Sequence, residues 1–100
     1  MTKGLEDVMM RIRGEEAELR RRGIRHLSVF GSMVRGTDRA DSDVDIAIEI
    51  EPGRSFSLIR MEETRLLLED LLERSVDLGE TTALRPPVRG AFDRENVQVF

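Results

Sequence analysis

Residues 43–50 read Asp-Val-Asp-Ile-Ala-Ile-Glu-Ile, and this stretch decides the fold of the chain. Valine and isoleucine alternate with acidic residues or alanine, a period of two that is typical of a β-strand with one buried face. The alternation places Asp43 and Asp45 together on the face opposite the core. Pro52-Gly53 then ends the predicted strand.

A second strand and a tight turn are predicted just before this one. Residues 25–30 alternate well enough to form a strand, which stops at Gly31-Ser32. Ser32 is expected to cap a short helical turn through residues 33–35, which Gly36 ends. The chain therefore passes from a strand through a glycine-serine turn into the start of a helix.

Two longer helices are expected to pack on the sheet. Residues 4–22 predict one amphipathic helix closed by Gly23, with apolar residues at helical spacing at Leu5, Val8, Met9, Ile12 and Leu19. A second core helix is expected from a cap at Ser55 to about residue 73. Its apolar positions are Leu58, Ile59, Met61, Leu66, Leu68 and Leu72.

The last quarter of the chain predicts two more strands around a helix. Residues 74–78 indicate a short strand, Thr81 or Thr82 is expected to cap a helix with two prolines near its start, and residues 96–100 indicate a final strand. The order α-β-α-β-α-β-α-β predicts one domain over residues 1–100. Its fold class is mixed α/β, with a mixed sheet of about four strands packed with helices.

Composition limits the classes of protein to consider. The chain has 100 residues, 39% hydrophobic and 36% charged, which predicts one globular domain with a modest core. Cysteine is absent, so neither disulfides nor thiolate metal sites are possible, and a cytoplasmic location is expected. The sequence shows no signal peptide and no apolar run long enough to span a bilayer, so we expect a soluble protein without a membrane partner. A net charge of -4 argues against direct nucleic-acid binding through a broad basic surface.

The glycine-serine turn and the acidic strand together predict a metal–nucleotide site. Backbone amides at a helix start, with the hydroxyl of Ser32 and the unhindered Gly31, suit a phosphate group. Asp43 and Asp45 would repel each other unless a cation lay between them. Mg²⁺ fits best, because triphosphate oxygens can supply its other ligands. A metal beside a phosphate implies phosphoryl-transfer chemistry.

Asp77 is the expected third carboxylate, if the short strand that carries it pairs beside the Asp43–Asp45 strand. In a reaction with two Mg²⁺ ions, one ion would hold the triphosphate and the other, held by Asp43, Asp45 and Asp77, would activate the acceptor hydroxyl. Asp77 would also be the general base. Arg35 and Arg39 are candidates to neutralise the triphosphate, and Arg35 is favoured by its place on the short helix.

These residues resemble a known signature. Gly31-Ser32, ten intervening residues and then Asp43-Val44-Asp45 resemble the signature of polymerase-β-like nucleotidyltransferases. The short chain, its opening helix and its Val76-Asp77-Leu78 segment resemble in particular the minimal nucleotidyltransferases of that superfamily.

The resemblance implies an activity and a partner. Members of the minimal group are typically antitoxins of a HEPN-domain ribonuclease toxin, and they transfer AMP from ATP to a tyrosine hydroxyl of that toxin. It also implies Mg²⁺, a complex with the toxin or with other copies of the chain, and a site built from Asp43, Asp45, Asp77, Gly31, Ser32 and Arg35. This chain has no tyrosine, so such an acceptor would lie on another protein.

Several alternatives remain open. Asp41, Asp43 and Asp45 could open a calcium loop, but Ile46 and Pro52 stand where that loop needs glycine and glutamate. The acids could form only a solvated strand face. The protein could neutralise its partner by binding alone, with a vestigial nucleotide site, or could act on a small molecule or an RNA end. The lone histidine, His26, is expected to be structural.

Overall fold

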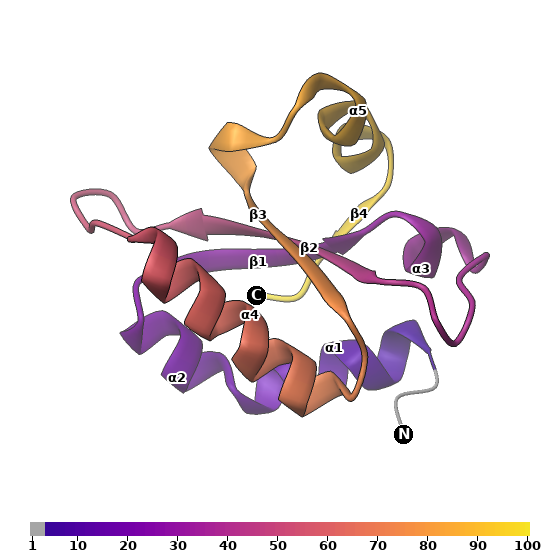
Figure 1. Cartoon of the computed structure of the whole chain (residues 1–100), viewed down its shortest axis with the longest axis horizontal. Helices are drawn as coiled ribbons and strands as arrows, with labels where there is room; N and C mark the ends of the chain where they lie inside the picture. The colour runs from indigo at the N-terminus through magenta and orange to yellow at the C-terminus, as the bar shows by residue number, and fades with distance from the viewer. Residues whose placement is uncertain (1–3) are drawn as a thin grey trace.

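The computed structural model describes residues 4–100 and is built around a four-stranded sheet in the order β3-β2-β1-β4 (Figure 1). Its strands are β1 (Ile24–Phe30), β2 (Val44–Ile50), β3 (Val76–Glu80) and β4 (Asn96–Gln98). Strand β1 runs antiparallel to both β2 and β4, whereas β2 and β3 are parallel. The predicted mixed α/β fold with about four strands is confirmed.

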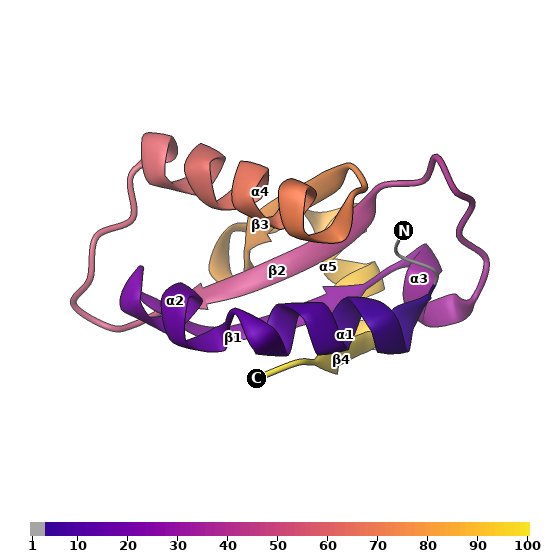
Figure 2. The same ribbon diagram turned by 90° about the horizontal axis from the view of Figure 1, so that it is seen from below.

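Three helices cover one face of the sheet and one helix stands over the other. α1 (Leu5–Gly14), α2 (Glu16–Arg21) and α4 (Leu58–Leu72) lie side by side on the first face (Figures 1 and 2). α5 (Pro86–Arg94) lies on the opposite side, and the four-residue α3 (Ser32–Arg35) follows β1 directly. Since α4 connects the parallel strands β2 and β3, it is the crossover that such a pair requires.

The core lies between the sheet and the three-helix layer. Strand β2 sends its alternate β-branched side chains there, and the helices supply the opposing residues. The apolar side chains at 0% exposure are Val8, Ile12, Leu19, Leu27, Val29, Val44, Ile46, Ile48, Leu68 and Leu72. Each aliphatic side chain buried in this way contributes about 2 kcal/mol of hydrophobic stabilisation. The face that carries Asp45 is thereby left for α5 and the solvent.

The single helix predicted over residues 4–22 is wrong, because the chain breaks it at Glu15. Glu15 has a φ of -107° and a ψ of 12°, and its amide donates to the Ile12 carbonyl at 2.9 Å rather than continuing the α-helical pattern. Gly14, just before it, is a poor helix former. Gly23, with a φ of 109°, does end the second piece before β1.

The predicted helix caps need correction as well. Ser32 is the first residue of α3 and Gly31 occupies the cap position, with no side-chain cap bond. Ser57, not Ser55, caps α4, and its hydroxyl accepts the Arg60 amide at 3.0 Å. Residues 81–83 form a short 3-10 helix, η1 (Thr81–Ala83), so neither threonine caps α5.

The remaining boundaries shift by a few residues. β3 runs two residues past the predicted end, and Arg85 precedes α5, whose first residues are Pro86-Pro87 as the fixed φ of proline favours. β4 ends at Gln98, after which the Val99 amide still donates to Leu27. Chain order is otherwise as predicted.

The apolar positions of α4 are only partly buried. Thr64, Leu68 and Leu72 are buried at helical spacing, and Met61, which precedes them on the same side of the helix, is partly buried. Leu66 and Ile59 lie on the other side of the helix and are 50% and 74% exposed, so their expected place in the core is wrong. Leu58, in the first turn, is also exposed. Among residues 4–100, no helix has the length and apolarity to cross a membrane.

Candidate active site

Two aspartates come together where β2 and β3 pair. The strands are in register, with Asp45 opposite Asp77, and on its other side Asp45 is opposite Phe30 of β1. Paired residues on neighbouring strands point to the same face, and adjacent strands are about 4.8 Å apart. The predicted pairing of the Asp77 strand beside the Asp43–Asp45 strand is therefore confirmed, and both carboxylates lie on the face below α5.

Asp43 precedes the first residue of β2 and stands exposed beside this pair. The pKa of Asp45 is raised to about 6 by burial of the half-buried carboxyl, and further by the negative charges of Asp77 and Asp43. Arg35 acts in the opposite direction. Three acids thus influence one another at the end of β2, and the repulsion would be relieved by a cation.

Gly31 allows Asp45 to lie against the main chain. A Cβ atom at residue 31 would stand 2.2 Å from Oδ2 of Asp45, far inside contact distance, and the φ of Gly31 is +81°. Both the space and the backbone conformation therefore require glycine here. At Gly31, the turn between β1 and α3 therefore packs directly against Asp45 of β2.

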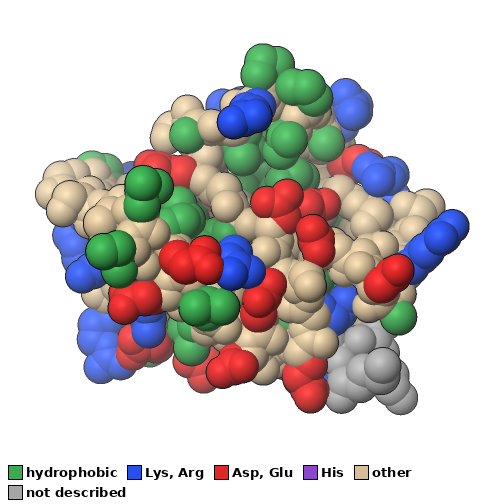
Figure 3. Space-filling model, in the orientation of Figure 1, with side chains coloured by type: hydrophobic (Ala, Val, Ile, Leu, Met, Phe, Trp, Pro, Cys, Tyr) green, Lys and Arg blue, Asp and Glu red, His purple; other side chains and the backbone are tan. Residues whose placement is uncertain are grey.

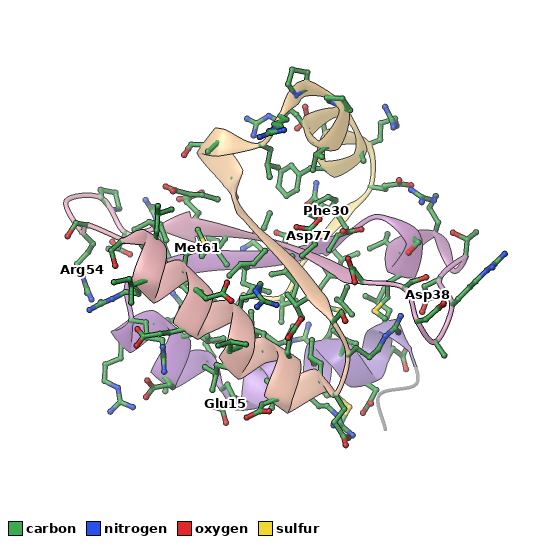
Figure 4. All side chains as sticks on the ribbon, in the orientation of Figure 1. Glu15, Phe30, Asp38, Arg54, Met61 and Asp77 are labelled. Atoms are coloured by element: carbon green, nitrogen blue, oxygen red, sulfur yellow. The ribbon has the colours of Figure 1, made fainter. Side chains whose placement is uncertain are left out.

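A pocket opens between α5 and the row of acids formed by Asp43, Asp45 and Asp77, which we call the acidic row. It has a volume of about 250 Å³ and is lined by Phe30, Gly31, Arg35, Asp45, Asp77, Pro87, Val88 and Ala91. Figure 3 shows acidic side chains gathered at the middle of this face, next to the apolar side chains of α5. In Figure 4, Phe30 and Asp77 lie together beneath that helix. One wall is thus charged and the opposite wall apolar, as suits a ligand with a phosphate end and a planar end.

The apolar side of the site is held by an aromatic contact. The rings of Phe30 and Phe92 meet edge to face, with centroids 5.6 Å apart. A second pocket of about 230 Å³ continues from Phe30, Asp77 and Val88 toward Gly79 and Leu84. Neither Phe30 nor the wall formed by α5 is predicted from the sequence, because their roles depend on how α5 folds back over the sheet.

Arg35 reaches the site from the end of α3. Its guanidinium donates to the carboxylate of Glu95, which follows α5, and it also lines the pocket. The structure thus brings Arg35 together with Asp45, and the positive charge of Arg35 partly offsets the rise in the pKa of Asp45. Arg39 is exposed in the loop after α3, where its main chain contacts Ser42 and Arg74. Ser32 is half-buried, and its carbonyl accepts the Thr37 amide at 2.9 Å.

The donor chemistry of the site fits Mg²⁺. The side chains beside the pocket offer carboxylate oxygens, which are the ligands that this ion prefers. Burial first, and then the negative charges of Asp77 and Asp43, raise the pKa of Asp45, and a cation would offset both effects. Within residues 4–100, no three His, Cys, Asp or Glu side chains are already gathered closely enough to hold a metal ion. The metal-ligand roles of Asp43, Asp45 and Asp77 stay a prediction.

Comparison with known proteins gives matches along nearly the whole chain. The profile of the nucleotidyltransferase domain family matches residues 10–98. Protein adenylyltransferase MntA of Thermococcus cleftensis is 38% identical over 95% of each chain. A solved structure of a minimal nucleotidyltransferase is 34% identical, with a TM-score of 0.76 over 95% of each chain.

A more distant match shares the fold. It comes from the complex of a tri-AMPylated HEPN toxin of Shewanella oneidensis with MNT antitoxin, and it has 18% identity and a TM-score of 0.67 over 93% of this chain and 71% of that one.

Proposed function

Because the chain belongs to the nucleotidyltransferase domain family, we propose that it transfers AMP from ATP to a hydroxyl group of a partner protein in a Mg²⁺-dependent reaction. The observation that carries the proposal is the in-register pair of Asp45 and Asp77 beside Gly31. The relative of 38% identity, named a protein adenylyltransferase, supports adenylyl transfer to protein.

The chemistry follows from the acidic row. The acceptor hydroxyl oxygen would form a bond to the α-phosphorus of ATP while the bond from that phosphorus to the bridging oxygen of the β-phosphate breaks. Pyrophosphate leaves, and the hydroxyl proton passes to a carboxylate, for which we assign Asp77 as general base. Mg²⁺, when bound by Asp43, Asp45 and Asp77, would supply the positive charge that makes the hydroxyl acidic and the triphosphate reactive.

The other residues of the site bind and orient the nucleotide. The main-chain amides of Gly31, which precedes α3, and of Ser32, its first residue, can donate hydrogen bonds to a phosphate group. The guanidinium of Arg35 is a further donor for phosphate oxygens. To engage phosphate fully, Arg35 would exchange its bond to Glu95 for a bond to the ligand. The apolar wall formed by Pro87 and Val88 suits the adenine ring.

The partner is a HEPN-domain toxin, and the protein acts as its antitoxin. The fold shared with a chain from a complex of an AMPylated HEPN toxin with MNT antitoxin supports this assignment. The acceptor is a tyrosine hydroxyl. It belongs to the partner, because this chain contains no tyrosine.

Co-expression tests the proposal in cells. Wild type should suppress the toxicity of a HEPN-domain toxin from the same genome, and intact-mass spectrometry should find AMP on the recovered toxin. A variant carrying Asp43→Ala and Asp45→Ala should lose both effects. Unmodified toxin together with full protection by this variant would favour neutralisation by binding alone. Modification of an RNA end or a small molecule instead would contradict the choice of acceptor.

A further inference from the structure

Arg74 is a buried cation close to the site that the reaction does not use. It lies between α4 and β3, three residues before Asp77, and its side chain is only 7% exposed. Burying a guanidinium is unfavourable unless its donors meet acceptors. The acceptors that it meets all belong to one segment, the loop between α3 and β2.

Three oxygen atoms of that loop accept hydrogen bonds from the guanidinium of Arg74. Nη1 donates to Oδ2 of Asp38 at 3.0 Å, and Nη2 donates to the carbonyls of Arg39 at 2.7 Å and Ser42 at 2.9 Å. Ser42 directly precedes Asp43. One side chain therefore links the loop before β2 to the chain before β3. Asp43 follows that loop directly, and Asp77 is the second residue of β3.

The surrounding backbone is tied at the same place. The Val44 amide donates to the Ser75 carbonyl at 2.8 Å, next to the paired residues Val44 and Val76. Within the loop, the Arg39 amide donates to the hydroxyl of Ser42 at 2.8 Å. Asp43 itself stands outside the β2–β3 ladder, so its position depends on the loop that Arg74 holds.

Stability alone does not account for this arrangement. Nε of Arg74 is buried and has no hydrogen-bond partner among the described residues. Buried ion pairs are often no more stabilising than apolar side chains of similar size. A planar guanidinium does, however, bond several oxygens in fixed directions, which an ammonium group does not do.

We propose that Arg74 is a positioning residue: by holding the 38–42 loop, it keeps Asp43 next to the Asp45–Asp77 pair, so that its carboxylate can join theirs when a divalent cation binds. The inference rests on the proposed metal-dependent function. It assigns Arg74 no contact with the nucleotide. Its effect on the site is exerted through Asp43.

Binding of Mn²⁺ in the presence of a non-hydrolysable ATP analogue tests this role without any transfer reaction. Electron paramagnetic resonance of free Mn²⁺ gives the affinity, and thermal unfolding checks the fold. Arg74→Lys should weaken Mn²⁺ binding about tenfold or more, as is usual when a residue supporting a metal ligand is changed. Arg11→Lys is the matched control, since Arg11 also bonds a carbonyl, that of Leu71 at 3.1 Å, but in the helical layer. It should bind as wild type does.

A double-mutant cycle with Asp43→Asn separates positioning from a general structural role. If Arg74 acts through Asp43, then Arg74→Lys should cause no further loss once Asp43 is replaced. Additive losses would overturn the proposal, and so would wild-type affinity in the folded Arg74→Lys variant. If Arg74→Lys does not fold, Asp38→Asn, which removes only one acceptor, should show a smaller loss with the same dependence on Asp43, and the absence of that loss would overturn the proposal.

The outcome for wild type keeps the two proposals apart. Failure of wild type to bind Mn²⁺ with the nucleotide analogue would contradict the proposed function and this inference together. Normal binding by wild type and by the folded Arg74→Lys variant would contradict the inference alone.

Discussion

Asp45 destabilises the metal-free protein at the position where the proposed function needs a carboxylate. Its carboxyl is half-buried next to two other acids, and its pKa is raised from 3.8 to about 6. A raised carboxyl pKa means that, as the pH increases, the folded protein keeps its proton to a higher pH than the unfolded chain does. The charged form of Asp45 therefore destabilises the metal-free protein near neutral pH.

Asp45→Asn should stabilise the metal-free protein, and the gain should depend on pH. At pH values well below 3.8, the carboxyl is protonated in both states, so the two proteins should differ little. As the pH rises from 3.8, the pKa in the unfolded chain, to about 6, the pKa in the folded protein, the unfolded chain is ionised before the folded protein is. Over this range the free energy of unfolding of wild type should fall relative to the variant by about 1 kcal/mol, after allowance for solvent screening. Urea denaturation in a chelator, across this pH range, measures the difference. A constant difference at all pH values would contradict the account.

Gly31 offers a second test at this scale. Gly31→Ala should lower the free energy of unfolding by about 3 kcal/mol and abolish AMP transfer, because the added methyl group collides with Asp45 and the backbone conformation is strained. Gly53 is a matched control, with a φ of +83° and nothing within 4 Å of an added Cβ. Gly53→Ala should cost only about 1 kcal/mol and leave transfer intact. Urea denaturation and a transfer assay on both variants check this, and equal losses of activity would show that space beside Asp45 is not the cause.

Secondary-structure elements were predicted well where a local pattern decides them. The alternation over residues 43–50 predicted β2, and its faces, correctly. The break at Glu15 was missed because apolar spacing continues across it from α1 to α2. Ile59 and Leu66 were assigned to the core because the sequence alone does not show which side of α4 meets the sheet, and a polar residue, Thr64, takes the buried position.

The cap of α4 provides a test at the scale of an element. Ser55 and Ser57 are both suitable residues, but only Ser57 accepts the Arg60 amide in the structure. Ser57→Ala should lower the free energy of unfolding by about 1 kcal/mol, whereas Ser55→Ala should change it little. Chemical denaturation of the two variants compares them directly. A larger loss of unfolding free energy for Ser55→Ala would contradict the assignment of Ser57 as the cap of α4.

The molecule as a whole brings together residues that are distant in the chain. The parallel pairing of β2 and β3 sets Asp77 beside Asp45, and the return of α5 over the sheet sets Val88 opposite them. The sequence predicted the acidic row, since strand order and a helical crossover suffice for it. The apolar wall of α5 and the hydrogen bonds from Arg74 to the 38–42 loop depend on the packing of loops and helices in three dimensions, which no local pattern shows.

The most direct test of the central claim follows the two ends of ATP. Purified protein and the proposed HEPN-domain partner are incubated with Mg²⁺ and ATP labelled either at the α- or at the γ-phosphorus. Adenylyl transfer predicts that α-label appears on the partner, that γ-label appears only in pyrophosphate, and that Asp45→Asn or Asp77→Asn removes the transfer. Transfer of γ-label to the partner, or α-label transfer that survives both substitutions, would contradict the site described above.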